Sequence, residues 1–260
     1  MKFYMNYTDS LGDFMNILPV FKGLYEKTGK IDLIVRQTTA RFQGFIEFLE
    51  YQDIFNSVSF DNNPVPDDYI SLKIDDPADE SSDNPNRPGE TRRWHNTIKR
   101  ITGLDFQVDD DFTLKYPDFK IDFNRDLFIV GDRWNGPLID GRRATNVLSY
   151  LATDPRFTFL DYRNNLLINC YLIKESNKPF ISNQTGIAVV ADLLKKDTIM
   201  VWKVDDWHPA FRQGDNISWG AGEGFGGRTV QETFLRNQYA DRNCRMVHAS
   251  ELEEVLKTYK

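Results

Sequence analysis

The chain has 260 residues, of which 40% are hydrophobic and 27% are charged, and its net charge is −7 at pH 7. This composition excludes a disordered tail, and the length suffices for two domains of about 130 residues each. No stretch approaches the ~20 apolar residues of a membrane span, and an acid, Asp9, stands where a secretory signal has its apolar run, so we expect a cytoplasmic protein.

Apolar periodicity predicts alternating strands and helices in the first half of the chain. In chain order we predict a strand at 2–7, a helix at 13–25, a strand at 31–35, a helix at 41–51, strands at 57–60 and 69–74, and a helix at 91–102. Pro19 falls inside the first helix and is expected to kink it or divide it in two. Nine acids and two bases between Asp61 and Glu90 account for the whole net charge, and most of this segment is predicted as a long loop.

The second half repeats the alternation. We predict strands at 127–130, 157–160, 179–181, 198–202 and 245–247, and helices at 145–152, 165–175, 187–194, 229–241 and 250–257. Strands separated by helices are typical of parallel sheets, so the sequence predicts an α/β fold with two domains, 1–118 and 119–260. Cys170 and Cys244 lack metal-ligand spacing and are predicted to be reduced thiols.

Two short segments lie where open parallel sheets bind ligands, at the end of a strand and the start of a helix. The first contains Gly12 and Asp13, and the second is Ser-Asn-Gln-Thr-Gly at 182–186. Small residues let the backbone approach an anion, and the Thr185 hydroxyl adds a donor. Each segment also fits an ordinary helix start, in which an acid complements the dipole or a Thr or Asn caps the helix.

Together the two segments resemble lipopolysaccharide heptosyltransferase-type glycosyltransferases. Residues 7–19, YTDSLGDFMNILP, are followed by a helix and the strand KIDLIV. That family has a Gly-Asp pair after its first strand and a Leu-Pro or similar pair a turn and a half later. Residues 171–191 are similar to its second half, with a helix, a short strand and a Thr-Gly heading a helix rich in small and apolar residues.

The resemblance implies two Rossmann-like domains of the GT-B type, whose parallel sheets face across a cleft. The N-terminal domain would take the acceptor, and the C-terminal domain the donor nucleotide sugar. Asp13 would be the general base that removes the proton of the acceptor hydroxyl. The residues expected to bind the donor and its leaving diphosphate are Arg133, Arg142, Ser182, Thr185 and Gly186. No metal and no cofactor are expected, because the nucleotide-diphosphate sugar is a co-substrate.

A basic stretch lies in the predicted acceptor domain. Residues 87–100 hold five bases and one acid, with Trp94 and His95 among them. Bases interleaved with an aromatic residue bind phosphates or anionic glycans, although a solvated helix face has the same pattern. On the binding interpretation, Arg92, Arg93 and Gly12 contact an anionic acceptor. This would be a lipopolysaccharide or other glycan core, or a hydroxymethylated base of phage DNA that is flipped or exposed.

Other features leave alternatives open. Asp205-Asp206 is similar to the acid pairs of metal-dependent glycosyltransferases, although the two-domain layout argues against that fold. The glycine run at 220–227 fits a lid over the donor or a plain surface loop, and His208 fits the cleft or a structural role. In place of an enzyme, the chain fits a non-catalytic nucleotide-binding interaction module. A sugar-nucleotide isomerase or reductase is disfavoured, since no Gly-x-Gly-x-x-Gly follows the first strand.

Overall fold

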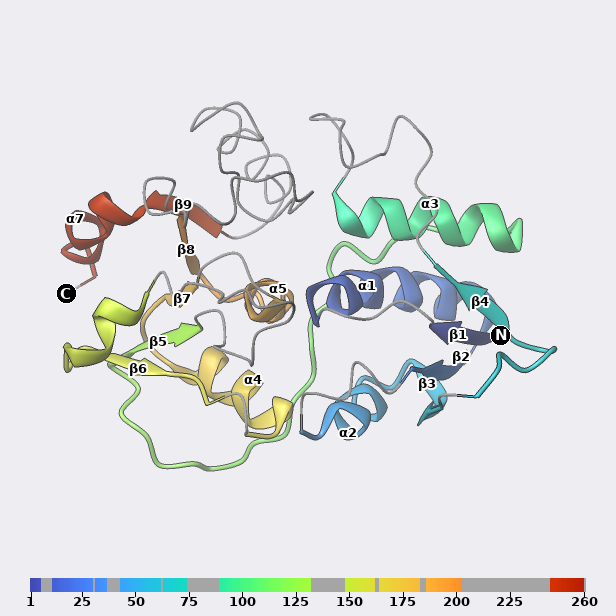
Figure 1. Cartoon of the computed structure of the whole chain (residues 1–260), viewed down its shortest axis with the longest axis horizontal. Helices are drawn as coiled ribbons and strands as arrows, with labels where there is room; N and C mark the ends of the chain where they lie inside the picture. The colour runs from blue at the N-terminus through green and yellow to red at the C-terminus, as the bar shows by residue number, and fades with distance from the viewer. Residues whose placement is uncertain are drawn as a thin grey trace. The chain divides into compact units, whose positions relative to one another are not determined.

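The chain forms two compact units, each built on its own parallel sheet (Figure 1). The computed structural model describes residues 1–5, 11–29, 31–36, 43–61, 63–73, 89–131, 148–161, 164–182, 186–202 and 244–259. Unit 1 comprises Met1–Lys120 and Asp161–Tyr171, and unit 2 comprises Ile121–Leu160 and Leu172–Lys260. Residues 161–171, which the sequence division assigned to the second domain, therefore belong to unit 1. Across these described ranges, no helix has both the length and the apolar character to cross a bilayer.

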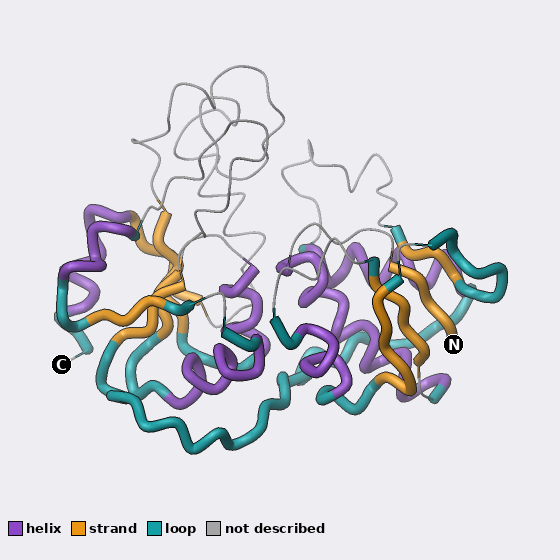
Figure 2. The backbone as a smooth tube through the Cα atoms, turned by 60° about the horizontal axis from the view of Figure 1, so that its bottom comes forward, coloured by secondary structure: helices purple, strands orange, loops and turns teal. Residues whose placement is uncertain are grey.

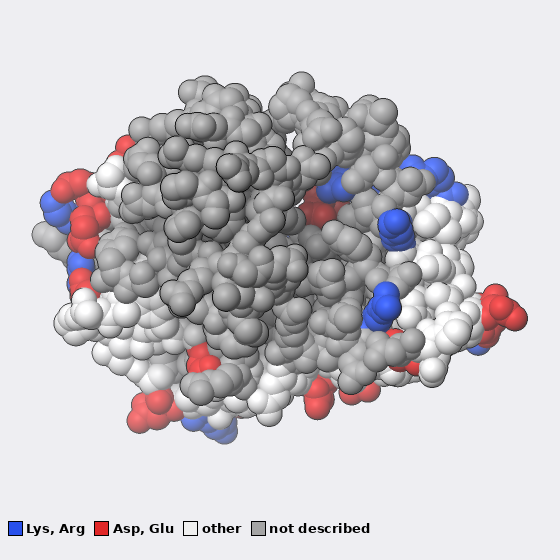
Figure 3. Space-filling view, in the orientation of Figure 1, with Lys and Arg blue, Asp and Glu red and all other residues white. Residues whose placement is uncertain are grey.

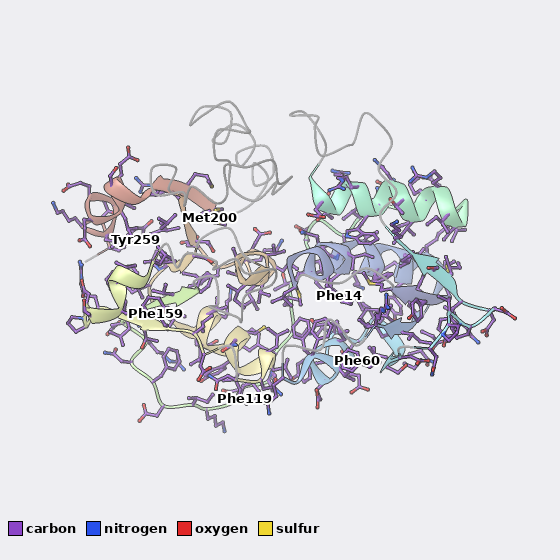
Figure 4. All side chains as sticks on the ribbon, in the orientation of Figure 1. Phe14, Phe60, Phe119, Phe159, Met200 and Tyr259 are labelled. Carbon is purple, nitrogen blue, oxygen red and sulfur yellow. The ribbon has the colours of Figure 1, made fainter. Side chains whose placement is uncertain are left out.

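Unit 1 contains a four-stranded parallel sheet in the order β3-β2-β1-β4. Its strands are β1 (Lys2–Met5), β2 (Ile31–Val35), β3 (Phe55–Phe60) and β4 (Ile70–Leu72), and its helices are α1 (Leu11–Thr28), α2 (Phe45–Glu50) and α3 (Glu90–Thr102). Aromatic rings fill the core between them. Phe14 of α1 meets Phe45 of α2 edge to face at 5.0 Å, and Phe45 stacks on Phe60 of β3 at 6.4 Å (Figure 4 labels Phe14 and Phe60).

Helix α1 continues through Pro19 over 18 residues, so of the two predicted outcomes, a kink or a division, the division does not occur. Proline removes one intrahelical hydrogen bond, a local cost that packing on both sides of the residue offsets. Leu18 and Val20 are fully buried, and the Pro19 carbonyl accepts a hydrogen bond from the backbone N–H of Asp109 at 3.2 Å. Helix α3 lies beside α1 (Figure 1) and ends as predicted at Gly103, whose φ is +67°.

Unit 2 contains a five-stranded parallel sheet in the order β6-β5-β7-β8-β9. Its strands are β5 (Phe128–Gly131), β6 (Phe157–Phe159), β7 (Phe180–Ser182), β8 (Thr198–Trp202) and β9 (Cys244–His248). Its helical elements are η2 (Ser149–Thr153), the end of α4 (Leu166–Glu175), α5 (Gly186–Leu193), η5 (Ala249–Glu251) and α7 (Leu252–Leu256). Figure 2 shows the helices that accompany each sheet. The prediction of two parallel α/β sheets is confirmed.

Two predicted helices of unit 2 differ in type from the expectation. The described part of 145–152 is the 3-10 turn η2, and 250–257 begins with the 3-10 turn η5 before it becomes α7. The predicted helix at 229–241 lies outside the described residues. Near the end of the chain, Tyr259 packs edge-on against Phe128 at 6.5 Å, and its carbonyl accepts a bond from Lys178 Nζ at 2.9 Å (Figure 4 labels Tyr259).

Candidate functional site

The first candidate site is the carboxyl end of the unit 1 sheet, where α1 begins. Five residues separate the end of β1 at Met5 from the start of α1 at Leu11. Gly12 is buried as the second residue of this helix, and Asp13 is the third. The helix therefore starts two residues earlier than predicted and carries Asp13 in its first turn. The side chain of Asp13 lies outside the described part of the structure.

Asn16 was not singled out from the sequence, although it lies about one turn after Asp13 on α1. Its side chain is only 3% exposed, and its neighbours Met15 and Ile17 are fully buried. A buried amide needs hydrogen-bond partners, and Asn16 is not without an interaction partner in the structure. The signal that could have identified it is a polar residue inside a continuous apolar helix.

The second candidate site is the carboxyl end of the unit 2 sheet. Gly131 and Ser182 end the neighbouring strands β5 and β7 and are paired in register. The Ser182 Oγ donates a hydrogen bond of 2.6 Å to the Gly131 carbonyl, and Gly186 starts α5 four residues later. A helix start beside strand ends is the usual anion-binding place in such sheets. Among the other predicted donor residues, Thr185, Arg133 and Arg142 lie outside the described residues.

Gly131 is packed so closely that any side chain there would force its neighbours to shift. A Cβ at this position would lie 2.5 Å from Phe180 Cζ and 2.7 Å from Ile187 Cγ2. Both distances are well below ordinary van der Waals contact, so the absence of a side chain lets α5 pack against the end of β5. The end of β5, the strand β7 and the first turn of α5 thus form one closely packed group.

The basic helix α3 carries its two candidate arginines in different environments. Arg92 is exposed, whereas Arg93 is only 6% exposed. Arg93 Nη1 lies 3.6 Å from Oε1 of Glu90, which is also buried. Consecutive helical residues point about 100° apart, and Trp94 at 0% exposure marks the buried face. Figure 3 shows basic side chains over α3. The structure therefore does not bring Arg92 and Arg93 together on one surface.

Other groups on α3 have structural partners. His95 Nε2 lies 2.8 Å from the Phe106 carbonyl, and the buried His95 ring meets Phe106 edge to face at 4.9 Å. Lys99 Nζ lies 2.5 Å from Asp105 Oδ1, and this hydrogen bond lowers the pKa of the Asp105 carboxyl. His95 and Lys99 thus attach α3 to Phe106 and Asp105 in the chain that follows it.

No group of three or more His, Cys, Asp or Glu side chains suited to a metal ion occurs among the residues described above. The candidates named from the sequence, Asp205, Asp206, His208 and the glycine run 220–227, lie outside the described residues.

No protein-family model and no curated protein sequence matches the chain, but solved structures do. A glycosyl transferase family 9 protein from Veillonella parvula DSM 2008 matches with a TM-score of 0.53 and 8% identity, over 99% of this chain and 88% of its own. TibC, an iron-containing dodecameric glycosyltransferase from enterotoxigenic E. coli H10407, matches with a TM-score of 0.55 and 9% identity, over 99% and 75%. The heptosyltransferase TibC in complex with ADP-D-beta-D-heptose matches with a TM-score of 0.52 and 10% identity, over 99% and 75%. The chain thus has a heptosyltransferase-like glycosyltransferase fold, which confirms the predicted resemblance at the level of the fold.

Proposed function

We propose that the chain is a glycosyltransferase that moves a sugar from a nucleotide-diphosphate sugar to a hydroxyl of an anionic acceptor. The observation that carries the proposal is the match of 99% of the chain to glycosyltransferases of known structure. TibC binds ADP-D-beta-D-heptose, which supports a nucleotide sugar as the donor.

The proposed reaction needs a base for the acceptor and positive charge for the leaving group. As the acceptor oxygen attacks the anomeric carbon, its proton passes to the Asp13 carboxylate in the first turn of α1. The bond from the anomeric carbon to the diphosphate oxygen breaks, and the diphosphate leaves with the electron pair. Backbone N–H groups at Thr185 and Gly186, together with Arg133 and Arg142, would stabilise this charge without a metal ion.

The structure refines the acceptor side of the proposal. Because Arg92 is exposed and Arg93 is buried beside Glu90, we assign acceptor contact to Arg92 and the support of α3 to Arg93. Gly12, buried in the first turn of α1, would let the acceptor approach the helix start. The acceptor classes that fit a basic contact are a lipopolysaccharide or other glycan core and a hydroxymethylated base of phage DNA.

We also propose a cytoplasmic location. The support is that Cys170 and Cys244, the two cysteines of the sequence, are thiols in the structure and not a disulfide. Paired cysteines are common in oxidising compartments and rare in the cytoplasm.

A binding screen followed by turnover tests the function. ADP, UDP, GDP and dTDP are each tested for thermal stabilisation of the full chain, and the sugar forms of any binder are then offered with core oligosaccharide or hydroxymethylated DNA. We expect one nucleoside diphosphate to stabilise the protein and its sugar form to be consumed. Substitution of Arg133 or Thr185 is expected to raise the donor KM. Binding without turnover of any sugar would instead indicate the non-catalytic interaction module, and the absence of binding would contradict both.

A further inference from the structure

Ser182, one of the predicted donor-binding residues, lies inside the unit 2 sheet. Its side chain is 0% exposed, and its hydroxyl donates to the Gly131 carbonyl at 2.6 Å. Gly131 and Ser182 are the last residues of β5 and β7, and they form the final pair of that ladder. The serine hydroxyl therefore adds a bond between the strands at the point where their backbone pairing ends.

This bond joins two strand ends after which the proposed donor residues follow in the sequence. Two residues after Gly131 the chain reaches Arg133, and after Ser182 it reaches Thr185 and the start of α5 at Gly186. The side chains of Phe180 and Ile187 pack closely against Gly131 at the same place, since a Cβ there would lie within 3 Å of both. A shift of β5 against β7 would therefore displace Gly131 relative to the first turn of α5.

We propose that Ser182 is a positioning residue, whose hydroxyl fixes the end of β5 against β7 beside the start of α5, where the proposed donor diphosphate would bind. The inference rests on the proposed function, since it concerns the site of the leaving diphosphate. Small displacements matter in such sites, where a misplacement of ~1 Å can cost ~100-fold in rate.

Ser176 is a matched control in the same unit. It is 5% exposed, and its Oγ donates to the Leu127 carbonyl at 3.0 Å, immediately before β5 begins. It also accepts a hydrogen bond from the backbone N–H of Lys178 at 3.1 Å. Both serines thus bond to a carbonyl at one end of β5, Ser176 at the amino end and Ser182 at the carboxyl end. A purely structural role predicts the same outcome for both substitutions.

The test compares wild type, Ser182→Ala and Ser176→Ala in the full chain. Calorimetric titration with ADP, UDP, GDP and dTDP measures affinity, and thermal melting measures stability. We expect Ser182→Ala to weaken binding of the nucleoside diphosphate about tenfold, because the loss of one positioning bond shifts its ligand groups. Ser176→Ala should lower the melting temperature at least as much but change affinity by less than about twofold, since its bonds lie away from the ligand end. Ser182→Cys, similar in shape with a weaker donor, should give an intermediate loss and serves as the test if Ser182→Ala fails to fold.

Equal affinity of wild type and the Ser182 variants would overturn the inference and leave the proposed function standing. Equal weakening by Ser182→Ala and Ser176→Ala would do the same, because it would show a general loss of stability. A wild-type protein that binds none of the four nucleoside diphosphates would overturn the proposed function and, with it, the inference.

Discussion

Replacing Gly23 with alanine tests how α1, the helix that carries Asp13, is held in unit 1. Gly23 faces the chain that follows α3, and a Cβ there would lie 1.8 Å from the Gln107 carbonyl oxygen and 2.9 Å from its carbon. Both are backbone atoms, so no side-chain rotation can relieve the contact. The segment around Gln107 must move away from α1 by more than 1 Å to reach ordinary contact.

Two opposing effects determine the sign of the change in stability. Alanine in a helix interior is favoured over glycine by about 1 kcal/mol. Overpacking a buried contact costs about 1–3 kcal/mol, and separation of the segments also weakens the hydrogen bond from Asp109 N–H to the Pro19 carbonyl, worth about 1 kcal/mol. Because the obstacle is backbone and the overlap is large, we take the upper end of the overpacking range. We expect a net loss of about 2–3 kcal/mol in the free energy of unfolding.

Urea unfolding followed by circular dichroism measures this loss. The control is Lys22→Ala on the preceding residue, which removes a partly exposed ion pair to Glu26 at 3.0 Å and should change stability by less than about 0.5 kcal/mol. If Gly23→Ala unfolded at the same or a higher urea concentration than wild type, helix propensity would dominate. The close approach of residues 107–109 to α1 would then be refuted.

Three further variants test other parts of the chain. Asp13→Asn should melt within about 2 °C of wild type yet lose transfer by at least ~100-fold in a donor-consumption assay, and wild-type turnover would remove Asp13 from the mechanism. Gly44→Ala should lower the melting temperature by about 4 °C, because φ is +72° and the new Cβ would lie 2.0 Å from Asn165 Nδ2; an unchanged melt would contradict that packing. Asn56 Nδ2 donates a hydrogen bond of 2.8 Å to Asp32 Oδ1, and a serine hydroxyl donates a second one, so the pKa of the Asp32 carboxyl is lowered. These bonds stabilise the folded state above the ordinary carboxyl pKa of about 4, and this stabilisation is lost as the pH falls through the lowered pKa. Asn56→Ala should thus shift the urea midpoint more at pH 7 than at pH 3, and an equal shift at both would rule out this linkage.

Much of the fold could be predicted because its cause is local. The strands at Ile31–Val35 and Thr198–Trp202 have the bounds predicted from apolar runs, and α3 ends at Gly103 in the left-handed conformation that glycine favours. The alternation of such strands with helices then predicted parallel sheets, because two parallel strands need a crossover connection, which is usually a helix. These patterns depend on residues within one or two turns of each other.

The parts that could not be predicted depend on contacts between distant residues. Residues 161–171 pack with unit 1 through the hydrogen bond from Leu166 N–H to the Gln43 carbonyl, 2.9 Å, and through Asn165 against Gly44. No local pattern records these partners. The different exposure of Arg92 and its neighbour Arg93 also depends on which face of α3 meets α1, and composition alone does not distinguish them.

Glycines mark the places where the candidate sites are held in position, although each one alone would be taken for a weak point of its element. Gly23 lets the chain after α3 approach the helix that carries Asp13, and Gly131 lets the first turn of α5, with Gly186, approach the end of β5. In both cases the partner is more than 45 residues away in the sequence. The missing side chain therefore weakens its own helix or strand but permits a close contact with a distant part of the chain. The elements that bear the proposed base and the proposed diphosphate contact are thus both held by close contacts that a single methyl group would disturb. Loss of function through Gly23 or Gly131 would therefore arise by displacement of the site, without any change in the residues that perform the chemistry.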